Sequence, residues 1–495
     1  MKRFWLFAML LAGTLVALNA PAFAKDAEEG GSSSADTEDI NSAIGGLASR
    51  VSNLEHAVKV EIHGFAETDA IVDDTRSFTE VVGNAAVVRP GSFAGDNGWS
   101  QLSMRNSRIA LLATSDVEGW KAKGYIEADF LGYDPAPAYA SAPASAAGTN
   151  SEINFYVAPT LRLRHAYLDL QKDGWDIMAG QYWTLFGWNM DYVLASVDVQ
   201  PVMGTLYERT PRIGVMKTIG NANDMQVQIA VDAERPEQKD SGLPNLNAGL
   251  RFVLNSWKGR FSYATGAAST RALSVGISAT ERNYVWPLAD TAAASNVNFL
   301  LNNVWGQSVA VDALIPLLPF EEGKDNPSAV VTGEWTMGSG YADALNGYTG
   351  GQSAMASSGV FPNMDAGIAG FDTNGNFTLI QEQSFNGQLQ IHLPPSIGTF
   401  LTVGYGETFS PNVSGLTGAA VNGTTVSGAN QLKLYNDDMC MFANVMQDIS
   451  PNIRVGVEYA RFDTHYSNSP AAYGGTNAGY DAIDHRVQLS TWYRF

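Results

Sequence analysis

The region 160–217 holds the side chains of this sequence that could bind or steer a charged molecule. Two stretches with the alternation of β-strands, Leu161–Leu170 and Trp175–Trp183, precede a segment rich in Trp, Tyr, Asp and Arg. If that segment folds across a water-filled space, its charges face those of the wall, and opposed charges create a field that orients zwitterions and dicarboxylates. An alternative is that these arginines only pair with carboxylates of the segment and select nothing. The basic candidates are Arg162, Arg164, Arg209, Arg212 and Arg251, and the acidic candidates are Asp191, Asp198 and Glu208.

The sequence offers little for catalysis or for metal binding. Its six histidines are scattered, and no pair has the spacing of metal ligands. Asp372–Asn376 has the alternating oxygen side chains of a calcium loop, but Phe377 replaces the glycine and Gln383 replaces the closing glutamate. We therefore expect a loop-tip turn there, and no phosphate loop, dinucleotide fingerprint or nucleophile elbow occurs elsewhere. The sequence predicts no metal, no cofactor and no enzyme. A lipolytic barrel is a third class, which would need a Ser-His pair on neighbouring strands, and no motif marks one.

The last ten residues, Arg486–Phe495, indicate what kind of wall would position these charges. Odd-numbered positions are apolar or threonine, whereas even-numbered positions include two arginines and a glutamine. A strand of a transmembrane barrel alternates in this way, because one face meets lipid and the other a wet lumen. Tyr493 and Phe495 would then lie in the aromatic girdle at one rim, and the terminal aromatic resembles the assembly signal of bacterial outer-membrane barrels. The alternative is a polar-faced strand of a soluble β protein.

Segments with the same alternation recur from Val60 onward. In Ala122–Phe130 and Ile453–Tyr459 the polar face carries charges, which a dry sandwich core would not accommodate but a water-filled barrel does. We count about 17 such segments, and single-chain bacterial barrels have even strand numbers, so we expect roughly 16 antiparallel strands within residues 59–495. Closure would leave no sheet edge exposed to lipid.

The connections between these segments fall into two classes. Short ones such as Ser450–Asn452 are typical of periplasmic turns, whereas long ones are typical of extracellular loops. Such long unstructured connections would be unusual in a soluble domain. The predicted long loops are Thr75–Ser100, Asp134–Pro159, Asn283–Asn303, Tyr341–Asn376 and Ser410–Gln431.

Residues 1–24 have the pattern of an export signal. Two basic residues precede the apolar core Phe4–Leu18, and small residues flank Phe23 before the expected cleavage after Ala24. That core is shorter than the roughly 20 residues of a membrane-spanning helix. Residues 25–39 are rich in Glu, Gly, Ser and Asp, which predicts a flexible spacer.

Residues 40–58 have the period of an amphipathic helix. Apolar residues recur at spacings of 4, 3, 4, 3 and 4, which is the seam of a heptad repeat. About three heptads associate weakly alone, so we expect a short periplasmic coiled coil added to a subunit that already forms a trimer. The alternative is a helix that packs on its own domain. The seam residues are Ile40, Ile44, Leu47, Val51, Leu54 and Val58.

Composition agrees with an exported barrel and excludes some partners. Removing Lys2 and Arg3 with the signal leaves 28 of the 30 basic residues against 50 acidic ones, a net charge of −22. This charge excludes nucleic acid as the expected partner. Aromatic residues reach 11%, enough for interfacial girdles, and the single cysteine, Cys440, excludes an internal disulfide framework.

Two stretches, Arg164–Leu170 and Ala179–Phe186, resemble the DcaP-like trimeric porin family, whose members share a basic-His-Ala-Tyr strand and a Gly-Gln-x-Trp-x-x-Phe strand end. Ile62–Phe65, preceded by the predicted helix, is similar to the family's first strand. Arg209–Arg212 lies where the family resumes its strands after the pore loop. The resemblance covers the architecture from Asp39 to the C-terminus, and its sharp motifs cover about residues 162–212.

The resemblance implies a homotrimeric porin in the outer membrane of a Gram-negative cell. It would allow passive diffusion of small hydrophilic solutes, with a preference for anionic, dicarboxylic or aromatic acids, and would contact the lipid bilayer and lipopolysaccharide. If Asp191, Asp198 and Glu208 line the constriction, they would favour cations instead. The alternative function is a structural or adhesin-type barrel with an occluded lumen.

Overall fold

The computed structural model describes the greater part of the chain from Val58 onward. The export signal, the spacer and the coiled-coil helix predicted over residues 1–58 lie outside the described residues, except for Val58. Among the described residues no helix is long and apolar enough to cross a membrane. The described ranges are 58–83, 85–132, 160–198, 202–238, 241–288, 300–347, 367–372, 377–416, 435–466 and 481–495.

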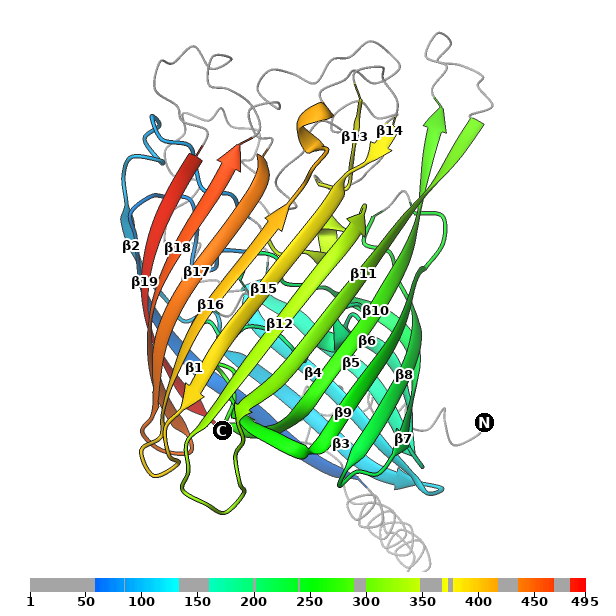
Figure 1. The fold of residues 1–495 in the computed structure, drawn as a ribbon, viewed down its shortest axis with the longest axis vertical. Helices are drawn as coiled ribbons and strands as arrows, with labels where there is room; N and C mark the ends of the chain where they lie inside the picture. The colour runs from blue at the N-terminus through cyan, green and yellow to red at the C-terminus, as the bar shows by residue number, and fades with distance from the viewer. Residues whose placement is uncertain are drawn as a thin grey trace, which may run out of the picture. The chain divides into compact units, whose positions relative to one another are not determined.

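One antiparallel sheet closes on itself to form a barrel (Figure 1). The closing pair joins β1 to β19, from Phe65 opposite Arg494 to Asp73 opposite Arg486, so the barrel has no free edge. β2 pairs with the second half of β1 and β3 with the first half, so these two together occupy one position. The 17 strands of the sheet therefore form a barrel of 16, as predicted from the sequence.

The barrel strands follow one another around the wall in chain order, and a separate two-stranded ribbon, β13–β14, lies in the β12–β15 connection. The strands are β1 (Lys59–Asp73), β2 (Trp99–Ser103), β3 (Arg108–Val117), β4 (Trp120–Gly132), β5 (Thr160–Lys172), β6 (Trp175–Trp183), β7 (Arg209–Gly220), β8 (Met225–Glu234), β9 (Asn245–Phe261), β10 (Ser269–Leu288), β11 (Leu300–Leu318), β12 (Ser328–Ser339), β13 (Ala369–Phe371), β14 (Phe377–Leu379), β15 (Gln381–His392), β16 (Thr399–Phe409), β17 (Tyr435–Asp448), β18 (Ile453–Tyr466) and β19 (Asp481–Arg494), and the short 3-10 helices are η2 (Trp188–Met190), η3 (Ala342–Ala344) and η4 (Val413–Gly415).

The two faces of the wall differ as the alternation predicted. On β19 the side chains of Arg486 and Gln488 are buried inside, whereas Val487 and Leu489 are exposed on the outside. β18 repeats the pattern in its first half, where Arg454 and Glu458 are buried inside and Ile453, Val457 and Tyr459 are exposed outside. Lipid requires an apolar outer face, which this wall has. Lipid also requires paired backbone groups, and closure of the sheet provides that pairing.

Long and short connections emerge at opposite ends of the barrel (Figure 1). The predicted loop Asn283–Asn303 is too long, because β10 continues to Leu288 and β11 begins at Leu300. Asparagines at both edges of this segment suggested a loop, but pairing with the neighbouring strand overrides that weak preference.

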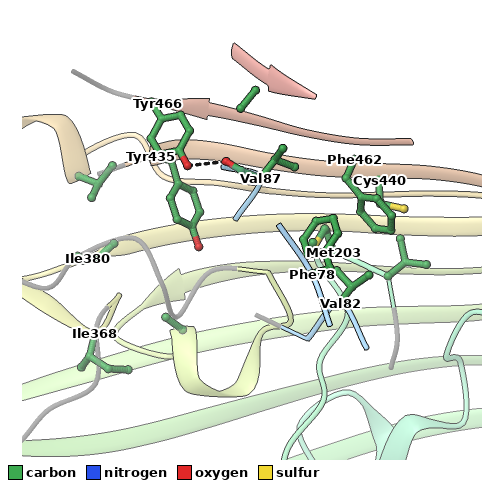
Figure 2. Packing of buried hydrophobic residues seen from close by; sticks show 14 of the residues in the cluster. Phe78, Val82, Val87, Met203, Ile368, Ile380, Tyr435, Cys440, Phe462 and Tyr466 are labelled. Atoms are coloured by element: carbon green, nitrogen blue, oxygen red, sulfur yellow. Dashed lines mark hydrogen bonds between the residues drawn. The ribbon is translucent and has the colours of Figure 1, made fainter. Parts of the chain in front are cut away.

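The core of this barrel lies in its lumen. Figure 2 shows a cluster in which Phe78, Val82 and Val87 of the β1–β2 connection pack against the inner faces of β17 and β18. The rings of Phe78 and Phe462 meet edge to face with centroids 4.9 Å apart. The hydroxyl of Tyr466 donates a 2.6 Å hydrogen bond to the carbonyl of Val87. Connections folded into the mouth therefore fill the β15–β19 side of the lumen.

Candidate functional site

The connection between β6 and β7 crosses the lumen, as predicted. We name the described part of this connection, residues 184–198 and 202–208, the lumen loop. At its start the hydroxyl of Thr184 donates to a carboxylate of β8 at 3.1 Å, and in its middle the indole of Trp188 donates to a carbonyl of β10 at 3.2 Å. At the far side the hydroxyl of Ser196 donates to Glu458 of β18 at 2.7 Å. Hydrogen bonds to strands on several sides of the barrel fix this loop as a partition of the lumen.

Two glycines of the wall provide the seat for Trp188. Gly249 of β9 and Gly276 of β10 lie directly under its ring, and a Cβ atom at Gly276 would come within 2.5 Å of the indole. Only glycine allows so close an approach at these positions. The sequence therefore fixes the loop by removing side chains from the wall as well as by adding polar partners.

A β-bulge places two consecutive residues of β5 on the lumen side. Glu127 of β4 pairs with His165 and the next residue pairs with Leu163, so Arg164 is the extra residue. Arg162 and Arg164 therefore face the lumen together with Tyr167, although a regular strand would put even and odd positions on opposite faces. The bulge gathers cationic and aromatic side chains on one patch of wall.

Two of the wall arginines are compensated by carboxylates of the neighbouring strand. Arg162 binds Asp129 with two hydrogen bonds of 3.0 and 2.6 Å. Arg164 binds Glu127 at 2.6 Å and Asp129 at 3.0 Å. These pairs join β4 to β5 inside the barrel, so part of the predicted basic ladder is held by wall carboxylates and not by the lumen loop.

Two further arginines of the same patch have no such compensation. Among the described residues, Arg108 and Arg209 form no ion pair, and the Nε of Arg108 and one Nη of Arg209 are buried without a hydrogen-bond partner. Arg209 instead lies over the ring of Trp183, 4.7 Å from its centroid. We name Arg108, Arg162, Arg164 and Arg209 the arginine cluster. Two of its four guanidinium groups contact carboxylates, namely Glu127 and Asp129.

The phenol of Tyr207 belongs to this patch. Its ring lies 4.8 Å from that of Trp183, and Arg209 lies 5.4 Å from its centroid. Burial raises the pKa of Tyr207, but the positive charges of the arginine cluster outweigh burial and lower its pKa to about 8. The lowered pKa and the ring contacts both place this phenol within the arginine cluster.

The arginine cluster opens on a cavity of about 260 Å³ between the wall and the lumen loop. One side of the cavity is basic and aromatic and includes Arg108, Arg164 and Trp183. The lumen loop lines the other side with polar and acidic groups, among them Asp191 and Asp198. Charges of opposite sign thus face each other across a narrow space, where they act more strongly than in open water.

The three acidic candidates of the lumen loop have arginine partners, but mostly not the predicted ones. Asp191 forms an ion pair with Arg251, as the sequence suggested. Asp198 instead pairs with Arg486 of β19 at 3.0 Å, and Glu208 pairs with Arg282 of β10 at 2.7 Å.

The last basic candidate is also held by the wall. Arg212 of β7 pairs with Asp232 of the adjacent β8 and so does not face a loop carboxylate. For Arg212 the ion pair found among the described residues is therefore within the wall. Sequence reasoning missed Arg108, Arg271, Arg282 and Trp183, of which Arg108 could have been found as the basic residue before the apolar run Ile109–Ala113. Within the described ranges no group of three or more His, Cys, Asp or Glu residues could hold a metal ion.

Comparison with solved structures relates this barrel to outer-membrane channels of similar fold. No family model matches the chain, and no curated protein sequence matches it. The outer membrane channel DcaP of Acinetobacter baumannii aligns with a TM-score of 0.56 and 18% identity, over 89% of this chain and 98% of that chain. OmpT of Vibrio cholerae and OmpF of Salmonella typhi align with TM-scores of 0.43, at 12% and 9% identity, each over 89% of this chain and 98% of their own. This barrel therefore has the fold of the DcaP outer-membrane channel, which the sequence motifs predicted.

Proposed function

We propose that this protein is an outer-membrane porin of a Gram-negative cell through which small hydrophilic solutes diffuse, with a preference for anions. The carrying observation is the arginine cluster, whose four guanidinium groups are matched by only two contacting carboxylates beside the cavity. An anion about 4 Å from an uncompensated guanidinium gains roughly 1 kcal/mol even in water-like surroundings. Passage needs weak binding of this kind, because a tightly bound solute would not leave.

Dicarboxylic and aromatic acids are the solutes that this patch suits best. Planar guanidinium groups bind carboxylates with two parallel hydrogen bonds. The rings of Trp183, Tyr182 and Tyr207 beside them offer flat surfaces for an aromatic acid. We infer that such a solute passes between the arginine cluster and the lumen loop, with its carboxylate towards the wall.

A homotrimer in contact with lipid and lipopolysaccharide is the proposed assembly. The motifs of β5 and β6 support it through the resemblance described above. The outward face of β1 adds a structural reason, because Ala66, Thr68 and Ala70 leave the wall flat enough for a second copy to approach. Native mass spectrometry in detergent would count the subunits, and a monomer would contradict this part of the proposal.

Planar-bilayer recording tests the function directly. We expect conductance steps in groups of three and a permeability that favours chloride over potassium. A cation preference would keep the porin but transfer the selective role to Asp191, Asp198 and Glu208. No chemical reaction is proposed for the lumen.

The second candidate is a structural or adhesin-type barrel with a closed lumen. The apolar cluster that fills the β15–β19 side of the mouth favours it, because the same packing extended across the barrel would close the passage. Absence of current from correctly folded protein would support this candidate over the porin.

A further inference from the structure

One connection at the short-turn end of the barrel folds into the lumen. We name residues 262–268, between β9 and β10, the inward turn. Its Ser262 and Ala264, with the preceding Phe261, are almost completely buried. By contrast, the turn between β11 and β12 exposes Glu321–Asp325 to solvent. The inward turn therefore differs from an ordinary connection, which would point away from the barrel.

The strand that leads into this turn is built to bend. Two consecutive residues of β10 pair with Leu254 and Lys258 of β9, so the three β9 residues between them have no pairing partner on β10. Such a bulge bends the strand and increases its local twist. The indole of Trp257, within the bulge, donates a 2.8 Å hydrogen bond to the carbonyl of Pro316. The bend is thus fixed to β11, the strand beyond β10 in the wall.

Arg454 of β18 binds the inward turn from the opposite wall. Its Nη1 donates to the carbonyls of Tyr263, Ala264 and Gly266 at 2.6, 2.9 and 2.8 Å, and its side chain is completely buried. The other edge of the guanidinium is held by both carboxylate oxygens of Asp448 at 2.8 and 2.9 Å. One arginine therefore joins a wall carboxylate to three carbonyls of the turn.

A glutamine holds the start of the same turn. The side chain of Gln390 on β15 accepts a 2.8 Å hydrogen bond from the backbone N–H of Ser262 and donates a 3.0 Å bond to its carbonyl. This two-point contact replaces the strand partner that the backbone of Ser262 lacks. Anchors on β15 and β18 thus draw a connection of β9 and β10 across the barrel.

The inward turn also contacts the lumen loop. The hydroxyl of Tyr263 donates to the carbonyls of Met190 and Asp191 at 3.1 and 3.3 Å. At the next position Ala264 belongs to the same buried apolar cluster as Val197. Turn and loop therefore join at two places.

The cavity beside the arginine cluster is bounded by both elements. Tyr263, Ala264 and Thr265 of the turn line it together with Asn189–Asp191 of the lumen loop. Arg271, just after the turn, also lines it and donates a 2.8 Å hydrogen bond to the carbonyl of Asp191.

We propose that the inward turn is the second half of the size filter, and that Arg454 is the residue that positions it. The inference rests on the proposed function, since a size filter needs a conducting pore. The lumen loop limits the passage from one side and the inward turn limits it from the short-turn side. Arg454 does not touch the solute, and it acts through the backbone of the turn that it holds.

Replacing residues 262–268 by an Asn-Gly turn tests the proposal, with deletion of Glu322–Lys324 from the exposed β11–β12 turn as the matched control. We expect the first change to raise single-channel conductance about twofold or more and to admit larger sugars in liposome-swelling assays. The control should keep the wild-type conductance and size limit. A folded 262–268 variant with wild-type conductance and size limit would overturn the proposal.

Arg454→Gln and Arg454→Lys separate positioning from folding. The glutamine should raise the size limit, whereas the lysine, which can still reach a carbonyl beside Asp448, should restore part of it while both variants remain heat-modifiable barrels on gels. An unchanged size limit in folded Arg454→Gln would overturn the assignment of Arg454.

The wild-type protein distinguishes the two proposals. If it is silent but the 262–268 variant conducts, the turn closes the pore and the open-porin function is wrong. Silence from both proteins would overturn both proposals.

Discussion

Buried arginines occur on two sides of this lumen, and their surroundings differ. On the β17–β19 side, Arg454 is bound by Asp448, and Arg486 is bound by Asp73 at 2.7 Å and by Asp198 at 3.0 Å. On the β3–β7 side, Arg108 and Arg209 form no ion pair with a described residue. The first side is filled by packed connections, and the second opens on the cavity.

This difference separates charges that hold the fold from charges that can act on a solute. A buried charge is costly unless a counter-charge and hydrogen bonds replace its water. Arg454 and Arg486 meet that requirement within the protein. Arg108 and Arg209 form no ion pair among the described residues, and water or an anion in the adjacent space can take that role. The uncompensated arginines are therefore the better candidates for selection, although sequence alone ranks all arginines equally.

The largest effect should come from the compensated side. Arg486→Met leaves Asp73 and Asp198 buried without their counter-charge, which costs about 3–5 kcal/mol in the free energy of unfolding. Urea unfolding in lipid vesicles, followed by tryptophan fluorescence, would measure the loss. Arg461→Met, which breaks a half-exposed pair with Asp463, should change stability by about 1 kcal/mol or less. Equal losses of unfolding free energy in the two variants would contradict the stabilising role assigned to the buried Arg486 pairs.

The next largest effect should be on ion selectivity, from the arginines without ion pairs, and the free energy of unfolding should change little. The double change Arg108→Gln with Arg209→Gln removes two positive charges beside the cavity. At about 1 kcal/mol for each charge, the anion-to-cation permeability ratio should fall roughly thirtyfold. Lys217→Gln is the control. The ammonium of Lys217 donates to the carbonyl of Asp173 in a turn, so its removal should leave the permeability ratio unchanged. A wild-type ratio in the double variant would contradict the role of the arginine cluster.

The pH dependence of selectivity should be smaller and can be assigned to one group. Because the pKa of Tyr207 is lowered to about 8, its phenol is neutral at pH 6.5 and negative at pH 9.5. The new negative charge cancels part of the arginine potential, so anion preference is complete below pH 8 and falls as pH rises through it, by about threefold to fivefold. Reversal potentials across this range would show the decline. In a Tyr207→Phe variant the anion preference should not change between pH 6.5 and pH 9.5. An identical decline in that variant would assign the titration to another group.

The smallest effect should follow from the loop side of the cavity. Asp191→Asn removes a carboxylate that is already paired with Arg251 and lies 3.8 Å from Arg271, and its side chain is 40% exposed. Solvent screens such a charge, so the anion preference should rise only about twofold. A larger rise would mean that Asp191 controls the passage as strongly as the arginine cluster does.

The wall could be predicted from the sequence because it depends on a period of two. The alternation of β19, the 16 strands and the limits of β6 follow from which side chains meet lipid and which meet water. The same rule gives the wrong inner face where the period is broken. The bulge at Arg164 brings even and odd residues of β5 to the lumen, and no local residue type announces a bulge.

The partners inside the lumen could not be predicted for a different reason. Asp198 pairs with a residue 288 positions away, and a lumen loop can face any strand of a closed wall. The inward turn has a composition no different from that of an ordinary connection, since its burial depends on Arg454 and Gln390 of distant strands. Which charges remain uncompensated is decided only when all strands are placed.

The seam between β1 and β19 has a consequence for assembly. Its hydrogen bonds, and the ion pair of Asp73 with Arg486, join residues separated by more than 400 positions. Contacts so distant in sequence form slowly, because the intervening chain must be ordered first. Until β19 arrives, the outer edge of β1 has unpaired backbone groups that could pair with another chain. During biogenesis the opening strand must therefore be shielded by an escort or an assembly machine until the final strand completes the ring.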